Sequence, residues 1–254
     1  MLYPSLSFRN STWTPAQLTT ALWLDAADAS TVTTVSGAVS QWDDKSGSGN
    51  HVTQANSALR PIYQSSVLNS LPVVRFDGSD DQLATSAAVL TQQVFGIYSV
   101  TANRNPSGES AVMGQYINGD PGRTFVYQNG VSTRLAAIFS GYGNANYNGT
   151  ANSSFHIFGY EAIGLTYSLF YEAVNQASGS ITGTSISNTT FKIGEPAGGT
   201  GGVYFPAFLD AAEIVVALAP LSTTDRQKLE GYLAHKWGLA GNLPVGHPYK
   251  NKAP

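Results

Sequence analysis

The carboxylates that could serve an enzyme are few and scattered along this chain. Charged residues make up 11% of its 254 residues. A retaining glycan hydrolase needs two carboxyl groups about 5 Å apart in one groove. Asp210 and Glu213 are the nearest pair in a predicted strand, but a spacing of three residues puts them on opposite faces of a regular strand. Glu161 and Glu172 stand alone in the sequence, so we expect no enzyme.

Other catalytic and zinc-binding patterns are equally weak. The string from Ser46 to Gly49 is the closest to a nucleophile elbow, but the flanking strand and helix patterns are missing. Cysteine is absent, which removes thiol catalysis, disulfides and cysteine metal sites. The histidines occur singly, with no pair at zinc-ligand spacing, at positions His51, His156, His235 and His247.

Two groups of aspartates offer the oxygen ligands that calcium prefers. Asp43 and Asp44 precede a turn rich in glycine and serine, and Asp77, Asp80 and Asp81 surround a glycine. The same carboxylates can instead cap turns by accepting hydrogen bonds from backbone amides. A structural calcium ion at these aspartates therefore stands as a hypothesis beside turn capping, and the sequence predicts no other cofactor.

The stretch 140–154 combines aromatic and amide side chains in what we predict to be a long hairpin loop. Tyrosine rings offer faces for stacking, while asparagines supply paired donors and acceptors, a mixture suited to sugars or to an adaptable protein contact. The candidate ligand-binding residues are Tyr142, Asn144, Asn146, Tyr147 and Asn148. A plain hairpin loop without a ligand is the alternative.

The clearest structural signal is a helix over 222–238 that follows a predicted core strand over 211–218. Ser222 and Asp225 fit a capping box at its start, and Gly238 ends it. Leu229, Tyr232, Leu233 and Trp237 recur at helical spacing and mark one apolar face. Charged residues lie largely off that face, namely Arg226, Lys228, Glu230 and Lys236. We predict a helical lid that Trp237 pins to a sheet.

Short strand patterns bounded by Gly, Asn and Pro fill the rest of the chain. They fall at 22–25, 39–42, 73–76, 94–101, 111–116, 124–128, 134–139, 155–160, 166–174, 191–193 and 203–208. Such regular short strands predict an all-β fold, a two-sheet antiparallel jelly-roll sandwich with one C-terminal helix. We expect an N-terminal arm or edge segment over 1–21 and a single domain over 22–254.

Charge and hydropathy limit the partners. The formal net charge of −3 leaves no basic patch to neutralise a phosphate backbone, so we expect no nucleic-acid partner. The first residues lack the features of a signal peptide, and no stretch approaches the roughly 18 apolar residues of a membrane span. We therefore expect a soluble protein with no membrane partner.

Several strings together resemble a known family. They are LWLDAAD, WDDKSGSGN, VVRFDGSDDQL, AEIVVALAPLSTTDRQKLEGYLAHKWGL and LPVGHPY. This combination, over about 22–249, resembles the laminin-G-like branch of the concanavalin A-like jelly rolls, as found in tailed-phage structural proteins and some bacterial surface proteins. The resemblance implies two curved stacked sheets that often bind glycans or other proteins. The middle section, FHIFGYEAIGLTYSLFYEAVNQASG, departs from the usual pattern.

The resemblance implies a non-enzymatic protein of the phage virion surface, with capsid decoration or an accessory structural role as the favoured reading. Its expected partners are other virion proteins and a cell-surface glycan. A tail-associated receptor-binding adhesin and a free carbohydrate-binding lectin module are the alternatives, and a glycan hydrolase is a weaker one. The oligomeric state stays open, a homo-oligomer included.

Overall fold

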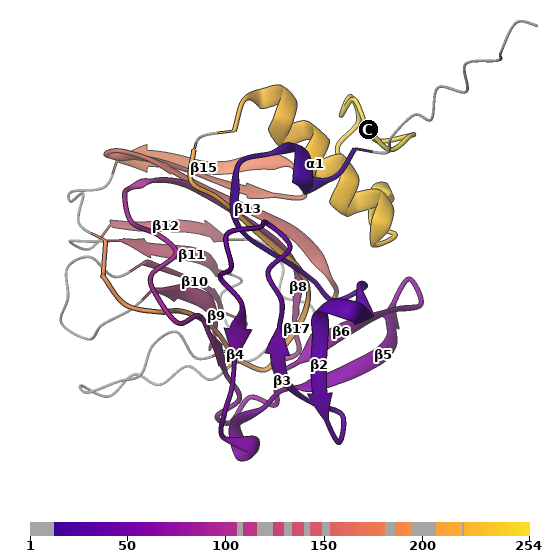
Figure 1. The fold of residues 1–254 in the computed structure, drawn as a ribbon. Helices are drawn as coiled ribbons and strands as arrows, with labels where there is room; N and C mark the ends of the chain where they lie inside the picture. Colours follow the sequence, from indigo (N-terminus) through magenta and orange to yellow (C-terminus); the bar gives the residue numbers. More distant parts are fainter. Residues whose placement is uncertain are drawn as a thin grey trace, which may run out of the picture.

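The computed structural model describes residues 13–105, 109–115, 124–129, 134–139, 143–148, 153–180, 186–194, 207–219 and 221–254. Seventeen strands and one α-helix occur in these ranges. The strands form two stacked antiparallel layers that short linking strands connect (Figure 1). The predicted two-sheet jelly roll with a C-terminal helix is confirmed.

The first sheet has β17 near its centre. Strands β1 and β6 both pair with one edge of β17, and β8, β13, β14 and β15 follow in order on its other side. The bounds are β1 (Thr20–Asp25), β6 (Leu71–Arg75), β17 (Leu209–Ala217), β8 (Val94–Asn103), β13 (His156–Ile163), β14 (Thr166–Tyr171) and β15 (Val174–Ser180).

The second sheet runs in the order β4, β7, β16, β9, β10, β11 and β12. Its bounds are β4 (Val52–Thr53), β7 (Leu83–Ala84), β16 (Phe191–Ile193), β9 (Glu109–Gln115), β10 (Thr124–Asn129), β11 (Arg134–Phe139) and β12 (Gly143–Asn148). Strands β2 (Val32–Val35), β3 (Ala38–Trp42) and β5 (Ile62–Leu68) link the two sheets. Short 3-10 turns occur at η1 (Pro15–Gln17), η2 (Ala29–Thr31), η3 (Ser57–Leu59) and η4 (Ala240–Asn242).

Strand β17 is buried at every position because both of its faces are covered. Ile214 and Val216 pair with Leu24 and Leu22 and point with them into the core between the sheets. The alternate residues face the other way, toward helix α1 (Thr223–Lys236), from which Lys236 reaches Glu213. A strand covered on both faces reads as a continuous apolar run, as the sequence predicted.

Helix α1 lies across the outer side of the first sheet, opposite β9 to β12 (Figure 1). Ser222 caps its start by accepting a hydrogen bond from the Asp225 amide at 3.1 Å. At its end, Leu239 N donates to Ala234 O and Gly238 N donates to His235 O, the pattern of a Schellman motif, with Gly238 at φ +73°. Trp237 is fully buried, which confirms the predicted lid and its anchor.

The predicted strand over 166–174 is wrong at its end. Glu172 and Ala173 have φ values of +49° and +62° and form a two-residue turn between β14 and β15. Such turns favour Asn-Gly, so Glu-Ala gave no turn signal. The predicted strand over 203–208 lies partly outside the described residues, and β17 begins only at Leu209.

The described part of the expected N-terminal arm packs against the domain. The Trp13 side chain is 8% exposed and its ring centroid lies 6.1 Å from that of Tyr232 on α1. Strand β1 then begins at Thr20.

Among the described residues, no helix has the length and apolar character needed to cross a membrane.

Candidate functional site

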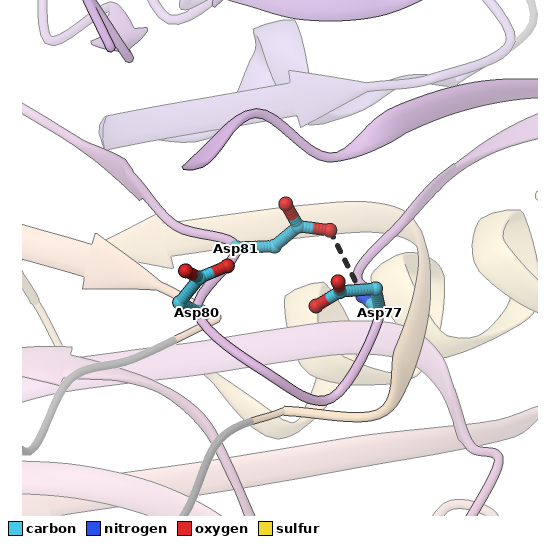
Figure 2. A group of neighbouring side chains, drawn as sticks. All are labelled: Asp77, Asp80 and Asp81. Carbon is cyan, nitrogen blue, oxygen red and sulfur yellow. Dashed lines mark hydrogen bonds between the residues drawn. The ribbon is translucent and has the colours of Figure 1, made fainter. Parts of the chain in front are cut away.

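Three of the aspartates proposed as calcium ligands lie on one turn between β6 and β7. One carboxylate oxygen from each of Asp77, Asp80 and Asp81 lies within 4.8 Å of the others (Figure 2). The Asp77 amide donates to Asp81 Oδ2 at 2.9 Å, and the Ser79 amide donates to Asp77 Oδ1 at 2.8 Å. Two of the three therefore cap the turn, and the group as a whole can offer oxygen ligands to a cation.

Asp81 is the buried member of this turn, whereas Asp77 and Asp80 are exposed. Burial raises the pKa of Asp81 to about 6, and the carboxylates of Asp77 and Asp80 also raise it. The hydrogen bond from the Asp77 amide acts in the opposite direction. A bound cation at this turn would have to displace the proton of Asp81 at mildly acidic pH.

Asp43 and Asp44 do not join this group. Asp44 Oδ1 accepts from the amides of Trp23 at 2.9 Å and Ser46 at 2.8 Å. Its Oδ2 accepts from Ser46 Oγ at 2.7 Å and from the Asn50 amide at 3.0 Å. With two donors on each oxygen, Asp44 caps the turn as the alternative predicted. Asp43 accepts from Gln41 Nε2 at 2.6 Å.

The candidate recognition stretch is not the long loop we predicted. Residues 143–148 form β12, which pairs with β11 from Gly143↔Phe139 to Asn148↔Arg134. Asn144, Asn146, Tyr147 and Asn148 therefore belong to a strand, and Tyr142 lies outside the described residues. Asparagine and glycine are depleted in strands, so the local signal favoured a loop and only pairing with β11 revealed the strand. The ligand-binding role of these residues stays a prediction.

The prediction that Asp210 and Glu213 lie on opposite faces is wrong. A register shift between Ala211 and Glu213 pairs Asp210 with Ala102 and Glu213 with Val100. Ala102 and Val100 are two residues apart on β8 and so share a face, which places both carboxylates on one side. The extra residue of the bulge reverses the alternation that the sequence spacing implied.

Both of these carboxylates are buried and held by structural partners. Asp210 accepts from Arg75 Nε and Nη2, each at 2.7 Å, and lies 3.1 Å from Arg104 Nε. Glu213 Oε1 accepts from Trp23 Nε1 at 2.7 Å and Tyr232 Oη at 3.1 Å.

The second oxygen of Glu213 is also paired. Its Oε2 accepts from Trp237 Nε1 and Lys236 Nζ, each at 2.7 Å. Burial raises the pKa of Glu213, and the Lys236 ammonium opposes that shift. Helix α1 therefore covers Glu213, and its partners leave it no free acceptor for a substrate.

Two residues that looked isolated in the sequence meet in the structure. His156 Nδ1 lies 2.7 Å from Glu172 Oε1, and Tyr171 Oη lies 2.9 Å from the same nitrogen. Asn242 of η4 donates to Glu172 Oε1 at 3.0 Å. Strands β13 and β14 pair antiparallel across the turn at Gly164 and Leu165, so placing that turn from sequence would have been the signal that brings His156 and Tyr171 together.

No protein-family model matches the chain, and no curated protein matches it. Solved structures with the same fold are, however, numerous. The binding domain of Paraclostridial Mosquitocidal Protein 1 superposes with a TM-score of 0.62 and 10% identity, over 86% of this chain and 53% of that one. Domain 4 of AbnA, an extracellular arabinanase from Geobacillus stearothermophilus solved with arabinotriose, gives 0.59 and 10%, over 83% and 98%.

A Trypanosoma rangeli sialidase, solved with sialic acid, gives a TM-score of 0.58 and 11% identity over 85% of this chain. The chain spans only 33% of the length of that sialidase. Identities this low show the shared jelly-roll fold and leave activity and ligand to be argued from the site.

Proposed function

We propose that this chain is a non-enzymatic binding module that recognises a glycan on a surface. The observation that carries the proposal is the match to the arabinanase domain, which covers 83% of this chain and 98% of that domain. That domain was solved with an arabinose oligosaccharide, which makes the same fold in this chain a candidate sugar binder.

The arrangement of the strand carboxylates supports a binding role over a hydrolytic one. Asp210 and Glu213 share a face, but each has an exposed fraction of 2% or less. Hydrolysis would require a carboxyl group open to the scissile bond and to water. A test is cleavage of an oligosaccharide panel by the intact chain and by Glu213→Gln; cleavage that the substitution removes would overturn the non-enzymatic reading.

A glycan array tests the binding proposal directly. We expect saturable binding that free sugar competes away. Tyr142→Ala and Tyr147→Ala then test the candidate residues at 142–148, and we expect both to weaken binding if that segment contacts the sugar. Uniformly blank wells at high protein concentration would reject glycan recognition.

We also propose that the module is displayed on a phage virion, in contact with other virion proteins. The support is the resemblance of its sequence strings to tailed-phage structural proteins. Antibody labelling of intact particles of the source phage, viewed by electron microscopy, tests this placement. Label over the capsid indicates decoration, label at the tail tip indicates an adhesin, and unlabelled particles would leave a free lectin.

A further inference from the structure

Four polar side chains from separate parts of the chain converge at one end of the first sheet. We call them the His156 cluster: His156 at the start of β13, Tyr171 at the end of β14, Glu172 in the next turn, and Asn242 at the end of η4. The His156 and Glu172 side chains are 15% and 11% exposed, and Asn242 is exposed. The cluster therefore lies just below the surface, with Asn242 outermost.

The turn that carries Glu172 has a strained backbone. Glu172 and Ala173 both adopt positive φ, a conformation that residues other than Gly, Asn and Asp rarely adopt. The Glu172 amide donates to Ile157 O at 2.9 Å, which folds the turn back onto β13. Turn residues in hairpins usually point into solvent, but Glu172 is only 9% exposed. Strain of this kind persists where surrounding contacts over-determine it, commonly at functional sites.

The Glu172 carboxylate is only half satisfied. Its Oε1 accepts from His156 and Asn242, whereas Oε2 is buried and has no hydrogen-bond partner. Buried polar atoms in folded proteins are nearly always paired, so an unpaired carboxylate oxygen calls for a missing donor. A ligand hydroxyl would supply that donor.

Aromatic rings border the cluster. The ring centroid of Tyr171 lies 5.5 Å from that of Phe158 and 4.9 Å from that of His156. A few convergent polar groups beside aromatic surface are typical of small-molecule sites. Sugars match this mixture because they present hydroxyl donors at their edges and apolar C–H groups on their faces.

We propose that the His156 cluster is a subsite for a neutral sugar, whose hydroxyl groups donate to Glu172 while its face lies against Tyr171. This inference rests on the glycan-binding function proposed above and adds the location and the sugar class. The Glu172 carboxylate repels an acidic sugar and lacks a donor of its own, so a sialic acid is excluded. Asn242 holds Glu172 in place by donating to Oε1 at 3.0 Å, which leaves Oε2 for a sugar hydroxyl.

The test uses the full chain, with neutral monosaccharides (galactose, glucose, mannose and N-acetylglucosamine) and N-acetylneuraminic acid as probes. NMR signals of the four imidazole rings are recorded, with His156→Gln to assign the ring of interest. We expect at least one neutral sugar to shift the His156 signals saturably and N-acetylneuraminic acid to leave them unchanged. Glu172→Gln should weaken the affinity by about tenfold or more, the range for a hydrogen bond to a charged group.

Two further variants separate recognition from folding. Asn242→Ala should weaken sugar binding, whereas Asn175→Ala is the matched control, since Asn175 is exposed and bonds with Ser178 of the same strand, β15. The double variant Glu172→Asn with Ala173→Gly restores a favoured turn and should raise the denaturation midpoint while it abolishes sugar binding. A purely structural Glu172 would let sugar binding survive this double substitution.

The outcomes distinguish this inference from the broader function. Array binding that leaves the His156 signals unmoved, or that survives Glu172→Gln undiminished, would overturn the subsite and keep the module as a glycan binder. Stronger binding of N-acetylneuraminic acid than of any neutral sugar would also overturn it. A blank array together with silent His156 signals would reject both proposals.

Discussion

Trp237, the residue that follows the last turn of α1, donates its indole N–H to Glu213 Oε2 on β17 at 2.7 Å. Trp23 on β1 donates to the other oxygen of the same carboxylate at 2.7 Å. Glu213 is fully buried, so one anion joins the helix, the central strand and its neighbour. A buried charge is tolerated only when it is paired and hydrogen-bonded, and this lid depends on such a pairing.

The hydrogen bond of Trp237 can be separated from its packing. Trp237→Phe retains most apolar burial but removes the donor, and we expect it to lower the free energy of unfolding by about 1.5–3 kcal/mol. Trp237→Ala should cost about 3–5 kcal/mol. Trp42→Phe is the control, because Trp42 is equally buried but its indole nitrogen has no partner. Urea denaturation measures all three, and equal costs for the two Phe variants would contradict the hydrogen-bonded anchor.

Lys236 neutralises two acidic residues beneath the helix. Its ammonium contacts both Asp25 and Glu213, which lie opposite each other in the β1–β17 register. Lys236→Met should destabilise the fold by about 3–5 kcal/mol, because it leaves buried negative charge uncompensated. Lys228→Met, on the same helix, removes a looser pair with Asp225 at 3.6 Å and should cost below about 1 kcal/mol. Similar losses in thermal or urea unfolding for both variants would argue against the buried ion-pair network.

Asp81 should make stability depend on pH in the mildly acidic range. Its pKa is raised from 3.8 to about 6 in the folded protein, so between these values the folded chain binds more protons than the unfolded chain. Stability therefore falls as pH rises from 3.8 to about 6 and levels off above that. Asp81→Asn should flatten this part of the profile, since an amide oxygen still accepts from Asp77. Asp80→Asn, the exposed neighbour, is the control; equal slopes for wild type and Asp81→Asn would contradict the assignment.

The calcium hypothesis for the 77–81 turn has a simple test. We expect calcium added to chelator-treated protein at neutral pH to raise the denaturation midpoint, because ligands that bind only the folded state stabilise it. Asp77→Asn and Asp80→Asn should each reduce the rise, and Asp43→Asn should leave it intact. If saturating calcium leaves the denaturation midpoint unchanged, the calcium hypothesis is wrong and these aspartates only cap the turn.

Features governed by neighbouring residues were predictable from the sequence. Ser222 and Gly238 mark the start and end of α1 because capping depends on groups within one helical turn. The nearly continuous apolar run of β17 indicated a strand covered on both faces. Strand periodicity with turn punctuation indicated the jelly roll. Asp44 took the turn-capping role that the small residues after it favoured.

Other features were decided only when distant segments met. The bulge in β17 moved Glu213 onto the same face as Asp210, against the alternation that spacing implied. Glu230 and Lys236 look like solvent-facing residues of the helix, yet Glu230 is 1% exposed and Lys236 reaches Glu213. The amide-rich segment 143–148 became a strand because β11 pairs with it.

The sequence by itself determined the fold class, the helix with its caps and its Trp237 anchor, because these follow from local periodicity and hydrogen bonding. The tertiary structure alone decided which buried carboxylates have hydrogen-bond partners on both oxygens and which retain an unpaired oxygen. The partners of Glu213 and Glu172 come from strands and turns up to 190 and 70 residues away, and no local pattern encodes such contacts. The physical reason is that burial and pairing of a charge depend on packing between sheets and helix, which exists only in the folded chain.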